Sequence, residues 1–236
     1  MKKKHEIVKE DILNKILIGD YEVGKLIPKE MDLADKYNVS RPTVRKAIQS
    51  LVRDGYLNRK QRIGTRVVRK KIDQGFTQSL TSFDTEMTRK GMTPKTQVIS
   101  FSEVEASEDV RTKLELNEDE LVYRLVRLRF GDDDPLVIVT TYLPSKYLPD
   151  LLEYDFQSYS LYSVLEKKGY GVKSISRTLE IILADELAGE LLDINENDPL
   201  FYFKSIGRTE KKIPIEFSVA RYRSDINTFQ FEIALD

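Results

Sequence analysis

The chain has 236 residues, with 38 Lys and Arg against 39 Asp and Glu, a formal net charge of -1, and no cysteine. The lack of cysteine excludes disulfides, thiolate metal sites and cysteine nucleophiles. No apolar run approaches the roughly 18 residues of a membrane-spanning helix, and the charged start MKKKHEIVKE is unlike a signal peptide. We therefore expect a cytoplasmic protein that does not enter a membrane.

Charge is distributed unevenly along the chain. Residues 1–75 contain 19 Lys and Arg but 10 Asp and Glu, whereas residues 76–236 contain 19 basic and 29 acidic residues. A basic segment joined to an acidic one predicts a module that binds a polyanion, attached to a second module. Chance variation of surface charge could give the same counts, so the motifs must decide between the two readings.

Three amphipathic helices are predicted in the basic segment. Apolar residues recur at helical spacing over residues 5–18, and a shorter helix is expected over residues 28–36, with Pro28 at its first position. The third helix is expected over residues 41–54. Its apolar stripe consists of Val44, Ala47, Ile48 and Leu51.

The residues at the two ends of the third helix predict its limits. Ser40 is expected to cap it by accepting a hydrogen bond from the backbone N–H of Thr43. Pro42 fits the first turn, where its missing donor costs nothing. Gly55 is expected to end the helix.

Three helices followed by a hairpin, here with strands over residues 56–59 and 65–68, define a winged helix-turn-helix. The third helix is then the recognition helix that enters a major groove. Arg45 on its outer face is the candidate for a bidentate contact to guanine, and Gly64 would let the wing approach a minor groove. The alternative is a solvated helix and a basic hairpin with no ligand. The predicted DNA-binding residues are Lys29, Ser40, Arg41, Pro42, Thr43, Arg45, Lys46, Gln49, Arg62, Gly64, Thr65 and Arg66.

Residues 71–80 have no strong periodicity and are predicted to link a DNA-binding domain, residues 1–70, to a second domain, residues 81–236. Within the second domain, ASEDVRTKLELNEDELVYRLVRLRFGDDDPLVIV is echoed by LADELAGELLDINENDPLFYFKSIGRTEKKIPIEFS, so that Asn117 corresponds to Asn195. Each copy predicts a short helix, a loop and a hairpin of two long strands.

Further strands complete the prediction for the second domain. With them the fold is expected to be α+β, an antiparallel sheet with helices against it. Two copies of a repeat are too few for a solenoid, so we interpret them as pseudo-symmetry inside one domain. The additional strands are expected near residues 97–104, 172–184 and 228–234.

Two arginines stand out on the predicted strand YRLVRLRF. Because strand residues alternate between faces, Leu125, Arg127 and Arg129 share one face, and Val126 and Leu128 lie on the other. Two guanidinium groups side by side can hold an anion. The alternative is that they pair with acidic neighbours on a solvated face.

The first 70 residues resemble a known family. The run LIPKEMDLADKYNVSRPTVRKAIQSLVRDGYLNRKQRIGTRVV is similar to the DNA-binding domain of the GntR family of bacterial transcription regulators. Two positions depart from the family pattern Pro-Ser-Glu and Gly-x-Gly-Thr, since Lys29 replaces the serine and the wing reads Arg62-Ile63-Gly64-Thr65, with only the second glycine kept. The resemblance implies a winged helix-turn-helix that binds operator DNA.

Residues 76–236 resemble the UTRA effector-binding domain of the HutC subfamily, which has a chorismate-lyase-like fold. The resemblance rests on LTSFDTEMTRKGMTPKTQV, the YRLVRLRF hairpin, SYSLYSVLEKKGY and PIEFSVARYRSDINTFQFEI. Asp84 stands where the pattern has serine, and Val139 where amino-sugar sensors have glutamate. The resemblance implies a phosphate held by Arg127, Arg129, Ser160 and Tyr162, with Glu216 and Tyr222 reaching the rest of the ligand. The predicted effector-binding residues are Phe83, Asp84, Arg127, Arg129, Ser160, Tyr162, Glu216 and Tyr222.

The leading hypothesis is a homodimeric DNA-binding repressor of a carbohydrate-utilisation operon, controlled by an anionic effector such as a sugar phosphate. The same regulator could instead sense a non-phosphorylated carboxylate or an amino acid. An enzyme on the chorismate-lyase-like fold and a ligand-free architectural DNA-binding protein are further alternatives. Neither a cofactor nor a metal is expected, since the sequence has no metal-ligand cluster, nucleophile elbow or phosphate-binding glycine loop, and the single histidine is His5.

Overall fold

The structure, a computed structural model, describes residues 2–60, 63–68, 71–74 and 82–231. It divides into two compact units, Met1–Ile72 and Asp73–Asp236. The point of division falls inside the segment 71–80 that was expected to be a linker. Each unit is described by itself.

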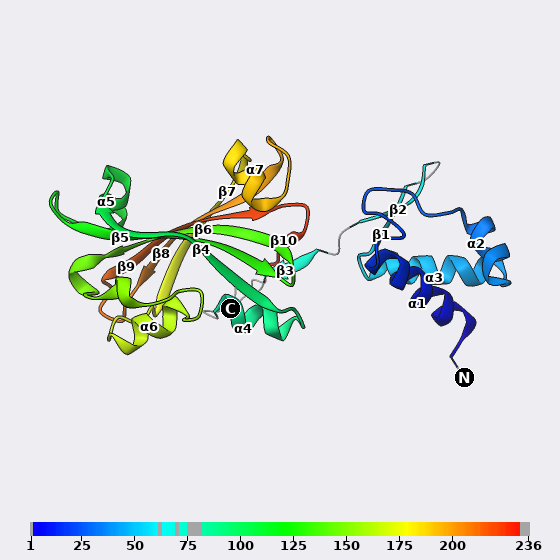
Figure 1. Ribbon diagram of the computed structural model, residues 1–236, viewed down its shortest axis with the longest axis horizontal. Coiled ribbons are helices and arrows are strands. Elements are labelled where there is room, and N and C mark those ends of the chain that lie inside the picture. The colour runs from blue at the N-terminus through cyan, green and yellow to red at the C-terminus, as the bar shows by residue number, and fades with distance from the viewer. Residues whose placement is uncertain (1, 61–62, 69–70, 75–81, 232–236) are drawn as a thin grey trace, which may run out of the picture. The chain divides into compact units, whose positions relative to one another are not determined.

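The first unit is a winged helix-turn-helix. Its elements are α1 (Lys4–Leu17), α2 (Glu30–Tyr37), α3 (Arg41–Arg53), β1 (Leu57–Lys60) and β2 (Gly64–Val67) (Figure 1). The predicted stripe of α3 is fully buried, where it meets Val8 and Ile12 of α1 and Leu33 of α2. Burial of this stripe, rather than helix propensity, fixes the orientation of α3, because side chains of this size contribute about 1.5–3 kcal/mol each.

The second helix begins later than predicted. Lys29 is the N-cap, with an extended ψ of 155°, so α2 starts at Glu30 and Pro28 precedes it. The N–H of Ile27 donates to the carbonyl of Thr65 at 2.9 Å, which ties this segment to the wing. That long-range hydrogen bond holds the backbone extended before the helix can start.

The end of α3 is a Schellman motif, as the glycine predicted. Gly55 has φ +83°. Its N–H donates to Val52 O at 3.1 Å, and the N–H of Tyr56 donates to Leu51 O at 2.9 Å. The chain therefore reverses sharply into β1, which brings the wing beside the recognition helix.

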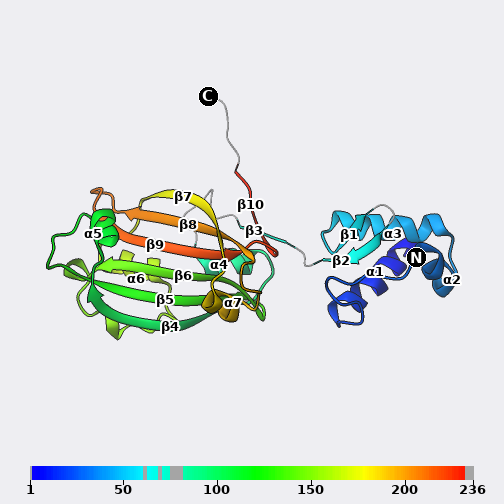
Figure 2. The same cartoon turned by 90° about the horizontal axis from the view of Figure 1, so that it is seen from above.

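The second unit is built on a six-stranded antiparallel sheet in the order β4-β5-β6-β9-β8-β7 (Figure 2). The sheet strands are β4 (Pro94–Glu105), β5 (Leu121–Gly131), β6 (Asp134–Pro144), β7 (Ser174–Leu183), β8 (Pro199–Arg208) and β9 (Pro214–Arg223). The helices are α4 (Phe83–Arg89), α5 (Glu108–Leu114), α6 (Leu161–Lys167) and α7 (Glu186–Leu192), with 3-10 turns at Ser145–Tyr147 and Leu151–Glu153.

The internal repeat appears as two β-α-β-β units, β4-α5-β5-β6 and β7-α7-β8-β9, which meet where β6 pairs with β9. The loops of the two units match in detail. The N–H of Asn117 donates to Glu120 and the N–H of Asn195 donates to Asp198, each at 2.9 Å. The α+β fold and its pseudo-symmetry are therefore as predicted.

The two faces of the sheet carry different helices, with α5 and α7 on one side and α4 and α6 on the other (Figure 1). Val126 and Leu128 pack beneath α7, whereas Leu125 packs beneath α6. Alternation along β5 then places Arg127 and Arg129 on the face of α4 and α6. This is the arrangement that the sequence predicted.

One expected strand lies elsewhere. The strand predicted near residues 228–234 is the short β10 (Asn227–Phe229), which pairs with β3 (Ile72–Gln74) outside the main sheet; residues 232–236 lie outside the described part of the chain. The start of the expected linker is thus a strand, held by a hydrogen bond from Gln74 to Asn227, both of them buried. Residues 75–81 of that linker are not described.

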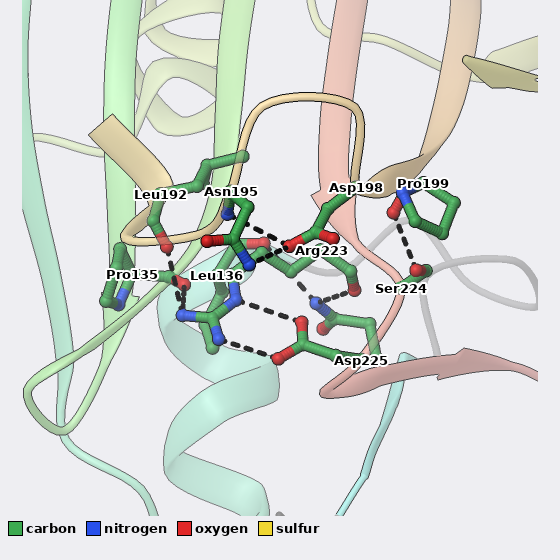
Figure 3. A network of polar contacts seen from close by, with 10 residues as sticks. Pro135, Leu136, Leu192, Asn195, Asp198, Pro199, Arg223, Ser224 and Asp225 are labelled. Carbon is green, nitrogen blue, oxygen red and sulfur yellow. Dashed lines mark hydrogen bonds and ion pairs between the residues drawn. The ribbon is translucent and has the colours of Figure 1, made fainter. Parts of the chain in front are cut away.

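A buried cation, Arg223, holds the end of β9 against two loops (Figure 3). Its side chain donates to Leu192 O at 3.0 Å and forms a two-point ion pair with Asp225 at 3.0 and 2.7 Å. A longer contact of 3.5 Å reaches Pro135 O. Arg223 is 2% exposed, so its truncation leaves these acceptors without a donor in a dry environment.

Arg223→Ala is expected to lower the free energy of unfolding of the second unit by about 2–4 kcal/mol. The matched control is Arg221→Ala, two residues earlier, whose partly exposed side chain makes a 3.4 Å ion pair with Asp185. That change should cost less than about 1 kcal/mol. Urea denaturation followed by tyrosine fluorescence measures both, and equal losses would show that the buried network does not stabilise the domain.

Candidate functional site

The outer face of α3 is free to meet a ligand in the described structure. The apolar stripe faces inward, and five of the predicted contact residues are exposed on the remaining faces. They are Arg41, Pro42, Arg45, Lys46 and Gln49. An exposed cationic helix of this kind has the arrangement that a major groove accepts.

The N-terminus of α3 differs in one contact from the prediction. Ser40 is the N-cap residue, but its hydroxyl does not accept from the N–H of Thr43. The two hydroxyl groups instead bond to each other at 2.8 Å, and the N–H of Thr43 donates to the carbonyl of Ser40 at 2.9 Å. The expected cap hydrogen bond was therefore wrong, although Ser40 does occupy the N-cap position.

Arg45 is held by an acidic side chain that the sequence did not single out. Its Nε and Nη2 donate to Glu30 Oε2 at 3.1 and 3.0 Å, and Arg59 of β1 lies 3.0 Å from Glu30 Oε1. Hydrogen bonding from Arg45 lowers the pKa of Glu30. Glu30 thus joins the recognition helix, the second helix and the wing, and it sets the direction of the Arg45 guanidinium.

The wing and the start of α2 carry the remaining predicted contacts. Lys29, Gly64 and Arg66 are exposed and Thr65 is half-buried, while Arg62 lies outside the described residues. Gly64 has φ +131°, and a Cβ there would lie 3.3 Å from the side chain of Leu26. The folded wing itself therefore requires this glycine, whether or not DNA is present.

A pocket opens on the α4 and α6 face of the sheet in the second unit, with about 820 Å³ of space including its mouth. All eight predicted effector-binding residues line it. The complete lining is Ser82, Phe83, Asp84, Glu86, Arg127, Arg129, Val139, Ser160, Leu161, Tyr162, Arg177, Ser205, Glu216, Ser218, Ala220 and Tyr222.

Arg127 and Arg129 form one wall of the pocket. The Nε atoms of both are buried and have no hydrogen-bond partner among the described residues. Arg127 is 3% exposed and donates from Nη2 to Thr141 at 3.2 Å. The guanidinium of Arg129 lies over the ring of Phe83, 4.8 Å from its centroid. Buried donors without partners are costly, which makes this wall a site for an acceptor-rich group.

This wall concentrates the positive charge of two guanidinium groups in a buried environment. Burial, and then the neighbouring Arg129, lowers the pKa of Arg127 to about 9, so that it remains charged at pH 7. Burial also lowers the pKa of Arg129, opposed chiefly by Asp84. The carboxylate of Asp84 therefore acts as a partial counter-ion beside the arginine pair.

The other predicted residues lie around the same space. Ser160 is the N-cap of α6, and Tyr162 follows in its first turn. Burial raises the pKa of Glu216, whereas a hydrogen bond from the Tyr162 hydroxyl and the charges of Arg127 and Arg177 lower it. Burial also raises the pKa of Tyr222, whose ring packs on Phe229 of β10 at 5.1 Å. Tyr222 thus links the pocket lining to β10.

Several pocket residues were missed by the sequence analysis. Arg177 and Ser205 come from β7 and β8, and Ser218 comes from β9. Alternation gives each strand its two faces, but only the register across the sheet brings Arg177 into line with Ser205 and Ser218. That register is long-range information, and no local signal in ISRTLE reveals it.

The fold and the two sites define a class of protein: a transcription regulator with a DNA-binding winged helix-turn-helix and a separate small-molecule-binding domain. Residues 4–67 match the model of the gntR family of bacterial regulatory proteins, and residues 89–227 match the UTRA domain. The chain belongs to the GntR family and carries a UTRA domain. It is a regulator that binds operator DNA and a small-molecule effector, and it is not an enzyme.

Relatives and solved structures agree with this membership. The chain is 29% identical to the HTH-type transcriptional repressor NagR of Bacillus subtilis, covering 94% of this chain and 91% of NagR. It is 31% identical to a probable fructoselysine utilization operon transcriptional repressor of Escherichia coli, covering 89% and 86%. The crystal structure of PhnF from Mycobacterium smegmatis is similar with a TM-score of 0.76 and 26% identity, over 97% of this chain and 100% of PhnF. Among the described residues, no helix is long and apolar enough to cross a membrane.

Proposed function

We propose that this protein represses a carbohydrate-utilisation operon and that a sugar phosphate bound in the pocket releases it from its operator. The observation that carries the proposal is the arginine pair, Arg127 and Arg129, whose buried Nε atoms have no partner among the described residues. The oxygens of a phosphate can accept charge-assisted hydrogen bonds from both guanidinium groups.

The relatives support the carbohydrate part of the proposal. One is described as a repressor of a fructoselysine utilization operon, and NagR is described as a repressor. Val139 occupies the pocket floor between Arg127 and Ala220, where it offers no counter-charge to an amino group. We therefore favour a phosphorylated sugar that lacks a free amine, such as a glucoside or disaccharide phosphate.

A carboxylate effector is the second candidate, and Asp84 is the observation that favours it. Its negative charge acts on Arg129 more strongly than that of any other acidic group. It therefore reduces the positive charge available to a dianion. A singly charged carboxylate sugar or amino acid would meet less repulsion there.

The operator-binding form is proposed to be a homodimer in the bacterial cytoplasm, where operator DNA lies. One recognition helix reads only a few base pairs, and two copies reading half-sites about one helical turn apart supply useful specificity. The DNA contacts are proposed to be the residues predicted from the sequence, with Arg45 as the base-reading side chain.

The test of the effector proposal is a thermal-shift comparison of sugar phosphates, the parent sugars and sugar carboxylates. A cognate sugar phosphate at about 100 times its Kd should raise the Tm by about 5–10 °C, whereas its parent sugar should not. Arg127→Ala should abolish the shift. Arg124→Ala is the matched control, because Arg124 lies on the opposite face of the same strand and contacts Ser100. Stabilisation by carboxylates alone would replace the phosphate proposal with the second candidate.

A further inference from the structure

The pocket has arginines at two different places on the sheet, Arg127 and Arg129 on β5 and Arg177 on β7. Directly paired residues of antiparallel strands point to the same face. The pairing places Arg177 of β7 beside Ser205 of β8, and Ser205 beside Ser218 of β9. In the adjacent row, Arg127 of β5 lies beside Val139 of β6, which lies beside Ala220 of β9.

The two arginine positions therefore lie at opposite sides of one floor. From β5 to β7 there are four strand-to-strand steps in the order β5-β6-β9-β8-β7, which is about 19 Å between backbones at the usual spacing. In these two rows the lining side chains between them are short, namely Val139, Ala220, Ser205 and Ser218, while Glu216 and Tyr222 of β9 line the pocket to either side. A long side chain entering from each side leaves space above this floor for a molecule larger than an isolated phosphate.

The β7 end combines donors and acceptors rather than cations alone. Arg177 of β7 and Ser205 of β8 meet Ser218 and Glu216 of β9, which lies midway between β5 and β7. The charge of Arg127 lowers the pKa of Glu216, and that of Arg177 lowers it further, so Glu216 lies within reach of both. A guanidinium and a carboxylate with hydroxyls beside them can both donate to and accept from sugar hydroxyl groups.

The charges of the lining oppose a second acidic group at this end. Three arginines face Asp84 and Glu216, and Glu86 is already paired with Lys90 at 2.7 Å. The arginine pair and Arg177 thus exceed the acidic side chains by one formal charge. A phosphate dianion bound at the arginine pair makes the net charge of the pocket negative. A second anionic group on the ligand would then add a buried negative charge without a cationic partner.

We infer that Arg177 determines effector specificity: together with Glu216 it binds hydroxyl groups at the end of the sugar opposite the phosphate. The inference rests on the proposed function and narrows its effector class. The ligand is a phosphorylated sugar of at least hexose size, with its phosphate at the arginine pair and its distal hydroxyls at β7. Arg127 and Arg129 then supply affinity for any phosphate, whereas Arg177 selects what the phosphate is attached to.

The test is calorimetric titration of the full-length protein with orthophosphate, glycerol 3-phosphate, glucose 6-phosphate and a disaccharide 6-phosphate. The wild type should bind one of the two larger sugar phosphates at least tenfold more tightly than orthophosphate. Arg177→Gln should remove at least tenfold of that preference while changing orthophosphate affinity less than twofold. Arg129→Gln should weaken orthophosphate and sugar phosphate by similar factors. Retained orthophosphate binding by Arg177→Gln also shows that its pocket is folded, and if that variant does not fold, Arg177→Lys carries the same comparison.

Each other result has a distinct meaning. If Arg177→Gln weakens orthophosphate and sugar phosphate equally, Arg177 acts only as background charge and the inference is overturned. If it changes neither affinity, Arg177 is a structural partner of Glu216 and the inference is again overturned. A wild type that binds orthophosphate but no sugar phosphate more tightly would also overturn it. A wild type that binds no phosphate at all would refute the proposed function itself.

Discussion

Arg127→Ala is expected to give a permanent repressor that no longer responds to effector. Arg127 is buried in the pocket wall, and loss of one charged, hydrogen-bonded partner of a phosphate should weaken effector binding by about 2–5 kcal/mol. The coupling between effector and operator needs to be only about 1–3 kcal/mol, so this loss is large enough to erase the response. The residues predicted to contact DNA belong to a different compact unit, so operator affinity without effector should be unchanged.

The measurement is fluorescence anisotropy of a labelled operator titrated with protein, with and without effector. Arg124→Ala serves as control and should respond like the wild type, because its side chain lies on the far face of β5. A variant Arg127→Ala that still releases operator at the wild-type effector concentration would show that the arginine pair is structural.

Arg45→Ala is expected to remove base discrimination at one operator position, at a cost of about 1–3 kcal/mol against the cognate operator. Binding to random DNA should change far less, since non-specific affinity comes from phosphate contacts. The variant should fold, because Glu30 retains its ion pair with Arg59.

Lys29→Ala is the matched comparison for Arg45→Ala. Lys29 is exposed at the start of α2, and as a phosphate-type contact its loss should weaken cognate and random DNA alike and flatten the salt dependence. Equal losses on cognate and random DNA for Arg45→Ala would place base reading on another residue.

The features predictable from the sequence are those set by the spacing of apolar residues and by residues that end a helix. A spacing of three to four residues gave the buried stripe of α3, and Gly55 gave its end. Alternation placed Arg127 and Arg129 on one sheet face, and the internal repeat predicted the two-fold organisation of the sheet. Each of these depends on neighbours within a few residues, or on a comparison of the chain with itself.

The features that could not be predicted depend on contacts between distant segments. Glu30 meets Arg45 only because α2 packs on α3, and Arg177 enters the pocket only through pairing across β8 and β9. The short strand β3 forms because β10 is available to pair with it. Ser40 shows the limit even for a local rule, since it occupies the N-cap position but its hydroxyl bonds to that of Thr43 and not to the backbone N–H.

The central claim is that occupancy of the pocket controls affinity for DNA. Its most direct test is the Kd of the wild-type protein for its operator, measured by anisotropy with and without a saturating sugar phosphate that raises the Tm. We expect the ligand to raise this Kd by about 5- to 150-fold, and operator DNA to weaken ligand binding by the same factor. A ligand that binds the pocket and stabilises the protein, yet leaves the operator Kd unchanged, would contradict it.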